Sequence, residues 1–195
     1  PTETLLRRAA TKSAVLSRIG GGRLLHFATH GELNRFAPLQ SNLRLTPTEA
    51  DDGRLTVDEI FDLDLSAELV GLAACDTGLG VGYKGDTGAA REAQEQVFPA
   101  GDELVGLSRA FLYAGTPSLV ASLWPVEDAS TASLMGRFYE NLRTMPKAEA
   151  LRQAQLSIIR EGQAADPGSE KTRLRHPYYW APFILIGDGQ SFVRP

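Results

Sequence analysis

Two short apolar runs each lead into a side chain that could take part in catalysis. Residues 24–29 precede His30 and Gly31, and residues 69–74 precede Cys75, the single cysteine of the chain. Continuous apolar runs of this length are typical of buried strands in a parallel sheet. If the two strands are parallel neighbours, the imidazole and the thiol emerge at the same carboxyl edge, where sites form in open α/β sheets. A thiol beside an imidazole is the minimal equipment for cysteine nucleophilic catalysis.

The chemistry of such a pair depends on the protonation of the thiol. An unperturbed cysteine has a pKa of about 8.5, so its thiol is mostly protonated at neutral pH. A nearby imidazole at His30 would raise the thiolate population of Cys75, or would protonate a leaving amine afterwards. The alternative is structural, because a free cysteine is also a common small core residue.

The residues around His30 suggest supporting roles. Gly31 lets the backbone approach a substrate, and its N–H, with that of Cys75, would form an oxyanion hole. The alternative for Gly31 is a simple turn glycine. His26 lies inside the apolar run, so we interpret it as a core or supporting histidine. Zinc binding by His26 and His30 would need a third ligand at typical spacing, and none is present, so we expect no metal.

Two carboxylates follow another apolar run. Residues 118–123 are followed by Trp-Pro-Val-Glu-Asp, which ends at Asp128. Asp128 could cap the helix that follows, which is the commoner fate of such a residue. Alternatively it could pair with a cationic side chain of a substrate beside the catalytic edge.

Hydrophobic periodicity predicts the elements that must position these groups. We expect a doubly wound α/β sandwich, with a mostly parallel central sheet and helices on both faces. An N-terminal helix and linker over residues 1–22 precede the main domain at 23–190. The remaining expected elements are helices over 4–19, 102–114, 128–143 and 147–160, a capping box at 56–59, strands at 42–46, 118–123 and 183–186, and a loose polar segment at 163–175.

Residues 81–101 form an expected flexible insertion, because glycine recurs around an Ala/Glu/Gln-rich stretch. Residues 80–85 match the G-x-G-x-x-G fingerprint of dinucleotide sites. Their position, well past the end of the strand rather than in its strand-to-helix turn, argues against nucleotide binding. We therefore expect no cofactor.

Composition excludes several classes of function. The 195 residues carry a formal net charge of −4 and are 43% hydrophobic, which is ordinary for a soluble globular protein. The absence of a basic stripe argues against direct binding of nucleic acid. One cysteine excludes an internal disulfide framework, and no apolar stretch is long enough to span a bilayer. The chain begins at Pro1 rather than Met, which indicates a piece of a longer protein.

Six motifs, taken in order, resemble the CHAT family. They are His-Phe-Ala-Thr-His-Gly, Ala-Cys-Asp-Thr-Gly-Leu-Gly, Gly-Leu-Ser-Arg-Ala-Phe-Leu-Tyr-Ala-Gly, Ala-Ser-Leu-Trp-Pro-Val-Glu-Asp, Lys-Ala-Glu-Ala-Leu-Arg-Gln-Ala-Gln and His-Pro-Tyr-Tyr-Trp-Ala-Pro-Phe-Ile-Leu-Ile-Gly-Asp. CHAT domains are bacterial caspase-like domains, often joined to tetratricopeptide repeats and related to separase and the caspases. The resemblance runs from about Leu24 to Asp188.

The resemblance implies a caspase-type fold and a cysteine endopeptidase. By position, His30 is the dyad histidine and Cys75 the nucleophile. The segment ending at Asp128 also resembles separase's Trp-Asp-Val-Thr-Asp segment, whose last aspartate helps to hold an arginine at the cleaved position. Asp128 would then line the S1 pocket, with Asp76 as a second candidate, and substrates would be cut after Arg or Lys. The insertion is longer than the family pattern.

The resemblance also implies a setting. We expect the protease domain of a larger bacterial signalling or defence protein, acting on protein substrates in the cytoplasm, with flanking repeat or sensor domains and no membrane. Lys84 and Arg91 are candidate processing sites within the insertion, where caspase relatives are often cleaved. The alternative function is a catalytically silent caspase-like module that binds proteins, although the presence of both dyad residues weighs against it.

Overall fold

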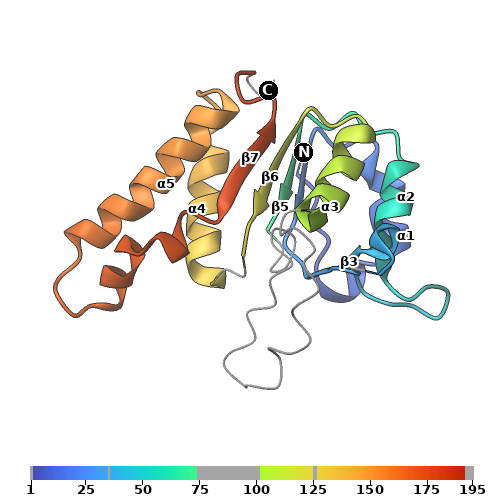
Figure 1. Cartoon of the computed structure of the whole chain (residues 1–195), viewed down its shortest axis with the longest axis horizontal. Coiled ribbons are helices and arrows are strands. Elements are labelled where there is room, and N and C mark those ends of the chain that lie inside the picture. Colours follow the sequence, from blue (N-terminus) through green and yellow to red (C-terminus); the bar gives the residue numbers. More distant parts are fainter. Residues whose placement is uncertain (1, 35, 74–101, 125–126, 192–195) are drawn as a thin grey trace.

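A four-stranded sheet lies at the centre of the molecule, with helices on both of its faces (Figure 1). The computed structural model describes residues 2–34, 36–73, 102–124 and 127–191. In spatial order the strands are β1 (Leu24–Phe27), β5 (Leu69–Leu72), β6 (Ser118–Ser122) and β7 (Phe183–Gly187). The β1–β5 and β5–β6 pairs are parallel and β6–β7 is antiparallel. The predicted α/β sandwich with a mostly parallel sheet is therefore confirmed.

The burial of the strands follows their place in the sheet. Every residue of β5 and β6 is buried, because helices cover both faces of these two central strands. The edge strand β1 is different, since only Phe27 is buried and Leu24 is 43% exposed. Continuous apolar runs thus predicted the central strands well, whereas β1 carries an apolar sequence on a partly open edge.

One helical layer is built from α1 (Lys12–Ile19), α2 (Val57–Phe61) and α3 (Asp102–Tyr113). Its side chains form one core with the sheet, and Ile60, Leu107 and Phe111 are completely buried there. α1 joins the same core through Ile19 and Val15. This layer lies on the right of the sheet in Figure 1.

The opposite layer consists of α4 (Asp128–Asn141) and α5 (Lys147–Ala164), which pack against each other on the other face of the sheet (Figure 1). Leu134, Phe138 and Ile158 are completely buried in its core. Two 3₁₀ helices follow, η4 (Glu170–Arg175) and η5 (Pro177–Tyr179). The expected loose segment at 163–175 is therefore wrong in part: α5 extends to Ala164, and Arg175 Nε donates to the Gly162 carbonyl oxygen at 2.9 Å.

A second, small antiparallel sheet lies beside the first layer. It contains β2 (Gly31–Glu32), β3 (Asn42–Arg44) and β4 (Arg54–Thr56), with the 3₁₀ helix η2 (Pro38–Gln40) between β2 and β3. Leu43 and Leu55 anchor it, because both are completely buried in the core of that layer. The sequence indicated only the strand near residues 42–46, since two- and three-residue strands are too short to show an alternating pattern.

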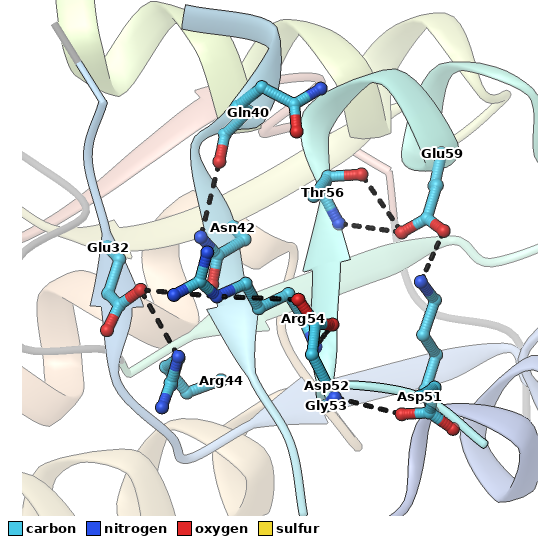
Figure 2. Close-up of polar contacts among 11 residues, drawn as sticks. Glu32, Gln40, Asn42, Arg44, Asp51, Asp52, Gly53, Arg54, Thr56 and Glu59 are labelled. Atoms are coloured by element: carbon cyan, nitrogen blue, oxygen red, sulfur yellow. Dashed lines mark hydrogen bonds and ion pairs between the residues drawn. The ribbon is translucent and has the colours of Figure 1, made fainter. Parts of the chain in front are cut away.

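The helix termini follow their local sequence signals, with one correction. α1 begins at Lys12 rather than near residue 4, because the Thr11 side chain accepts from the Ala14 N–H at 3.2 Å and caps the helix there. A short 3₁₀ helix, η1 (Arg7–Ala9), precedes it. The capping box predicted at 56–59 is confirmed, and Figure 2 shows the Thr56 N–H and hydroxyl both directed at the Glu59 carboxylate, at 3.0 and 2.9 Å.

Candidate active site

His30 lies just beyond the carboxyl end of β1 and is exposed. Its backbone is held by the small sheet. The His30 carbonyl oxygen accepts from the Arg44 N–H at 2.8 Å, and the hydroxyl of Thr29 donates to the Arg44 carbonyl oxygen. Two consecutive residues are therefore tied to the same residue of β3, which fixes where the chain leaves the main sheet and presents the imidazole.

Gly31 is buried in the edge strand β2, directly after His30. Gly31 stands opposite Leu43, while His30 bonds to Arg44. Antiparallel pairs alternate between bonded and non-bonded residues, so the Gly31 N–H and C=O point away from β3. The hydrogen bonds on the other side of β3 agree with this direction. Leu45 and Ser41 lie two residues on either side of Leu43, so their backbone groups face the same way, and both bond toward β4. The Gly31 N–H and C=O are thus directed to the side of β2 that faces away from β3.

Several predicted site residues lie outside the described residues. They are Cys75, Asp76, Lys84 and Arg91, together with the whole predicted insertion at 81–101. β5 itself is described to its end at Leu72, and the Ala73 N–H donates to the Phe27 carbonyl oxygen at 3.0 Å. The parallel pairing of β1 with β5 therefore continues to the residue after the strand.

Asp128 is the first residue of α4, not its cap. The N-cap position is occupied by Glu127, which makes no side-chain capping bond. Glu127 instead pairs with Arg173 at 2.6 Å, and that guanidinium lies 5.5 Å from the centre of the Tyr179 ring. Asp128 is exposed, and its carboxylate has no hydrogen bond or ion pair within the described part of the chain. Of the two carboxylates that follow β6, only that of Asp128 remains available to a cation.

The segment between β6 and α4 is attached to the C-terminal region. Trp124 donates its indole N–H to the Tyr178 carbonyl oxygen at 3.2 Å, which ties the chain after β6 to η5. His176 is exposed and accepts from the Tyr178 N–H through Nδ1 at 3.2 Å. The Trp-Pro motif and the His-Pro-Tyr-Tyr motif, distant in sequence, thus support each other beside the first turn of α4.

A contact between β1, β5 and α4 was not foreseen from the sequence. His26 Nδ1 and the Tyr139 hydroxyl are 2.8 Å apart, with the two rings edge to face. Gly71, opposite His26 in the sheet, leaves the space for this contact, because a Cβ there would lie 2.6 Å from the Tyr139 oxygen and 2.7 Å from His26 Nδ1. The interpretation of His26 as a supporting residue fits this contact, although its side chain is exposed rather than in the core. A glycine inside a strand pattern was the available signal, since it marks close approach.

The protonation of this pair is fixed by its surroundings. Burial of the imidazole on its Tyr139 side lowers the pKa of His26, and burial raises the pKa of Tyr139. At neutral pH the phenol therefore keeps its proton and the imidazole is neutral, and the two groups share one hydrogen bond between the Tyr139 oxygen and His26 Nδ1. This contact joins the strand that leads to His30 with the helix that begins at Asp128.

A pocket of about 720 Å³ opens beside β2 and adjoins Gly31. Sequence reasoning missed it, because its walls come from the segment interpreted only as loop-rich and from β3 and β4. Figure 2 shows Glu32 directed at Arg44 and Arg54, at 3.4 and 4.0 Å. Within residues that the structure describes, no three His, Cys, Asp or Glu side chains gather as a metal site would require.

The arrangement defines a class of protein: an α/β sandwich in which an exposed histidine follows the edge strand of a parallel sheet and an acidic segment follows a central strand. Comparison with known families narrows this class, because the model of the CHAT domain family matches residues 1–188. The chain belongs to the CHAT domain family. CHAT domains are caspase-like, which agrees with the observed sheet and its two helical layers.

Two curated relatives are similar over almost the whole chain. Tetratricopeptide repeat protein 28 of Homo sapiens is 26% identical over 231 aligned residues, and that of Mus musculus is 27% identical over 226. Both alignments cover 99% of this chain but 8% of the relative, so the chain spans only a small part of each relative's length. Both relatives are mammalian, and the bacterial origin inferred from the sequence stays a prediction. None of the helices among the described residues is long and apolar enough to cross a membrane.

Proposed function

We propose that this chain is a cysteine endopeptidase domain with His30 and Cys75 as its dyad. The register of the main sheet carries the proposal. Phe27 and Leu72, the last paired residues of two parallel neighbours, stand opposite each other, and each dyad residue follows its strand by three positions. Parallel neighbours leave the sheet at the same edge, so equal distances along the chain favour a meeting of the thiol and the imidazole there.

The proposed mechanism is acyl transfer through the thiol. The Cys75 thiolate attacks the scissile carbonyl carbon, and the C=O π electrons move to the oxygen. The N–H of Gly31, which points away from β3, donates to this oxyanion together with the N–H of Cys75. The C–N bond then breaks as His30 protonates the departing amine, leaving an acyl-enzyme. Water, deprotonated by His30, attacks the acyl carbon and releases the acid and the thiol.

Specificity for Arg or Lys at the cleaved position is assigned to Asp128. Its carboxylate is exposed and without an ion pair among described residues, whereas the adjacent Glu127 is neutralised by Arg173. α4 starts beyond the carboxyl end of β6, the next strand after β5, so a substrate side chain next to the scissile bond can reach it. Asp76 is the second candidate for the same role.

An arginine-based electrophilic probe tests the dyad. We expect the probe to label Cys75, and Cys75→Ala to abolish both labelling and cleavage of an arginyl substrate while thermal unfolding stays unchanged. A protein that unfolds normally but neither reacts with the probe nor cleaves the substrate would instead be the catalytically silent binding module. Full turnover by Cys75→Ala would contradict the mechanism.

A matched pair of variants tests the specificity residue. Asp128→Ala should reduce kcat/KM for arginyl substrates roughly 10- to 100-fold, the effect of losing one hydrogen bond to a charged group. Asp64→Ala is the control, because Asp64 is also exposed but precedes β5 at the other end of the sheet. Unchanged arginine preference in Asp128→Ala would move the S1 assignment to Asp76.

The proposed setting is a larger protein with flanking repeat domains, in the cytoplasm of a bacterium. The names of the mammalian relatives support a repeat context for the domain. Processing at Lys84 or Arg91 is the proposed activation step. Mass spectrometry of incubated protein should find cleavage after one of these residues, and full activity of an intact chain would contradict self-processing.

A further inference from the structure

His30 lies in the short crossing between the main sheet and the small sheet. β1 ends at Phe27 and β2 begins at Gly31, so residues 28–30 alone make this crossing. His30 is exposed, and its imidazole makes no hydrogen bond or ion pair with any residue that the structure describes. The position of the imidazole therefore depends on how the backbone of the crossing is held.

Arg44 of β3 holds the crossing with both of its backbone groups. The register places it opposite His30, whose carbonyl oxygen accepts from the Arg44 N–H at 2.8 Å. In a regular antiparallel ladder the His30 N–H would return a bond to the Arg44 carbonyl oxygen, because bonded residues exchange both bonds. Among the described residues, that oxygen accepts from the Thr29 hydroxyl instead. A side chain thus completes the last pair of the ladder.

β3 is a firm support for these two bonds. Leu43, the residue before Arg44, is completely buried and stands opposite Leu55 of β4, which is also completely buried. The residue after Arg44 is held as well, because the Leu45 N–H donates to the Gly53 carbonyl oxygen at 2.6 Å. The backbone of Arg44 is therefore fixed from both sides, independently of the crossing.

Resting on the proposed function, we propose that Thr29 is a positioning residue for His30. Its hydroxyl acts through the backbone, because it ties the peptide unit that leads into His30 to the fixed strand β3. The imidazole then keeps one place beyond the carboxyl end of β1. Such precision matters for an acid–base group, since a misplacement of about 1 Å can cost about 100-fold in rate. Valine has nearly the same shape as threonine but cannot donate, so it would leave the crossing with one bond fewer.

Isosteric replacement tests the role of the hydroxyl in catalysis. Thr29→Val should lower kcat for an arginyl coumarin amide roughly 10- to 100-fold and leave KM within about twofold, because a misplaced acid–base group weakens binding of the transition state and not of the substrate. Thr29→Ser keeps the hydroxyl and should restore kcat to nearly the wild-type value. A Thr29→Ser enzyme as slow as Thr29→Val would assign the effect to side-chain shape and overturn the proposal.

Thr46→Val is the matched control. Thr46 lies two residues after Arg44, is half-buried like Thr29, and also donates its hydroxyl to a backbone carbonyl oxygen, that of Arg7 at 2.7 Å. This bond leads to the N-terminal segment and not to His30, so we expect kcat to be unchanged. An equal loss of kcat in both valine variants would indicate a general weakening of the small sheet and would contradict a specific role for Thr29.

Amide hydrogen exchange separates the positioning role from protease activity. In the Cys75→Ala protein, adding Thr29→Val should accelerate exchange of the Arg44 N–H about tenfold, because that N–H bonds to the His30 carbonyl oxygen across the crossing. The Leu45 N–H bonds toward β4 and should keep its rate, which makes it the internal reference.

The two measurements can fail separately. Faster exchange at Arg44 alone supports the role of Thr29 even if the wild-type protein cleaves nothing, a result that would contradict only the dyad. An unchanged exchange rate at Arg44, or an unchanged kcat in an active Thr29→Val enzyme, overturns the positioning role and leaves the dyad intact.

Discussion

Replacing Gly71 by alanine would place a methyl group between two side chains that already touch. The added Cβ would lie 2.6 Å from the Tyr139 hydroxyl oxygen and 2.7 Å from His26 Nδ1, and Cβ atoms in proteins do not approach other heavy atoms so closely. Neither neighbour can simply swing away and keep the contact, because the two atoms are hydrogen-bonded to each other at 2.8 Å. Gly71 itself is buried in β5 between two paired strands.

The expected loss of stability follows from these contacts. Overpacking of a buried site costs about 1–3 kcal/mol, and loss of the hydrogen bond adds about 0.5–1.5 kcal/mol. The lower backbone entropy of alanine in the unfolded chain offsets about 0.5–1 kcal/mol. We therefore expect Gly71→Ala to lower the free energy of unfolding by roughly 2–3 kcal/mol, or Tm by about 4–12 °C for a chain of this size.

Urea unfolding of matched variants provides the assay. Gly136→Ala is the control, since Gly136 lies in α4 one turn before Tyr139 and a Cβ there meets nothing within 4 Å. That control should be neutral or stabilising, because alanine is the better helix former. The double variant Gly71→Ala/Tyr139→Phe should be less destabilised than the sum of its parts. A Gly71→Ala protein as stable as wild type would refute the close-contact reasoning.

Two further predictions concern titratable side chains. Because the pKa of His26 is lowered in the folded state, the unfolded chain takes up a proton first as the pH falls through about 6.5, so the stability present at pH 7.5 declines toward pH 5. His26→Asn, which keeps an acceptor for Tyr139, should reduce that decline in urea titrations. An identical pH dependence of the free energy of unfolding would contradict the assignment. Lys147 is 1% exposed and donates to Ser118 and Ser191 at 2.9 and 2.7 Å, while its carboxylate partner Asp188 remains partly solvated. Thermal unfolding should therefore show Lys147→Ala destabilised by about 2–4 kcal/mol, mainly through lost packing, and Lys147→Met by less than half of that. Equal losses of stability in the two variants would assign the effect to the charge of Lys147 instead.

Local sequence signals were sufficient for the longer elements. The apolar runs that became β5 and β6 are buried on both faces, so their pattern alone predicts them. The capping box at Thr56 and Glu59 is a contact between residues three apart, and it forms as predicted. The helix expected over 102–114 forms as α3, and Gly115 follows it with φ at +112°, where a Cβ would meet the Leu65 carbonyl oxygen at 2.6 Å.

Elements that depend on partners elsewhere were missed. β2 has two residues and exists because β3 holds it, so no pattern of its own could reveal it. The contact of His26 with Tyr139 joins residues 113 positions apart, and only the crossing of α4 over the sheet brings them together. Asp128 could not be assigned as cap or free carboxylate until the structure showed Glu127 at the cap and paired with Arg173.

By itself, the sequence determined the mostly parallel character of the central sheet, its helical layers, the family, and the residue types proposed to carry the chemistry, because these depend on short-range periodicity and on motifs in order. Tertiary structure alone decided which backbone groups face outward at Gly31, which carboxylate stays unpaired, and where a pocket opens beside His30. These properties depend on register and packing between distant segments. The energy of strand pairing that fixes these properties is shared between strands, so the sequence of any one strand does not encode it.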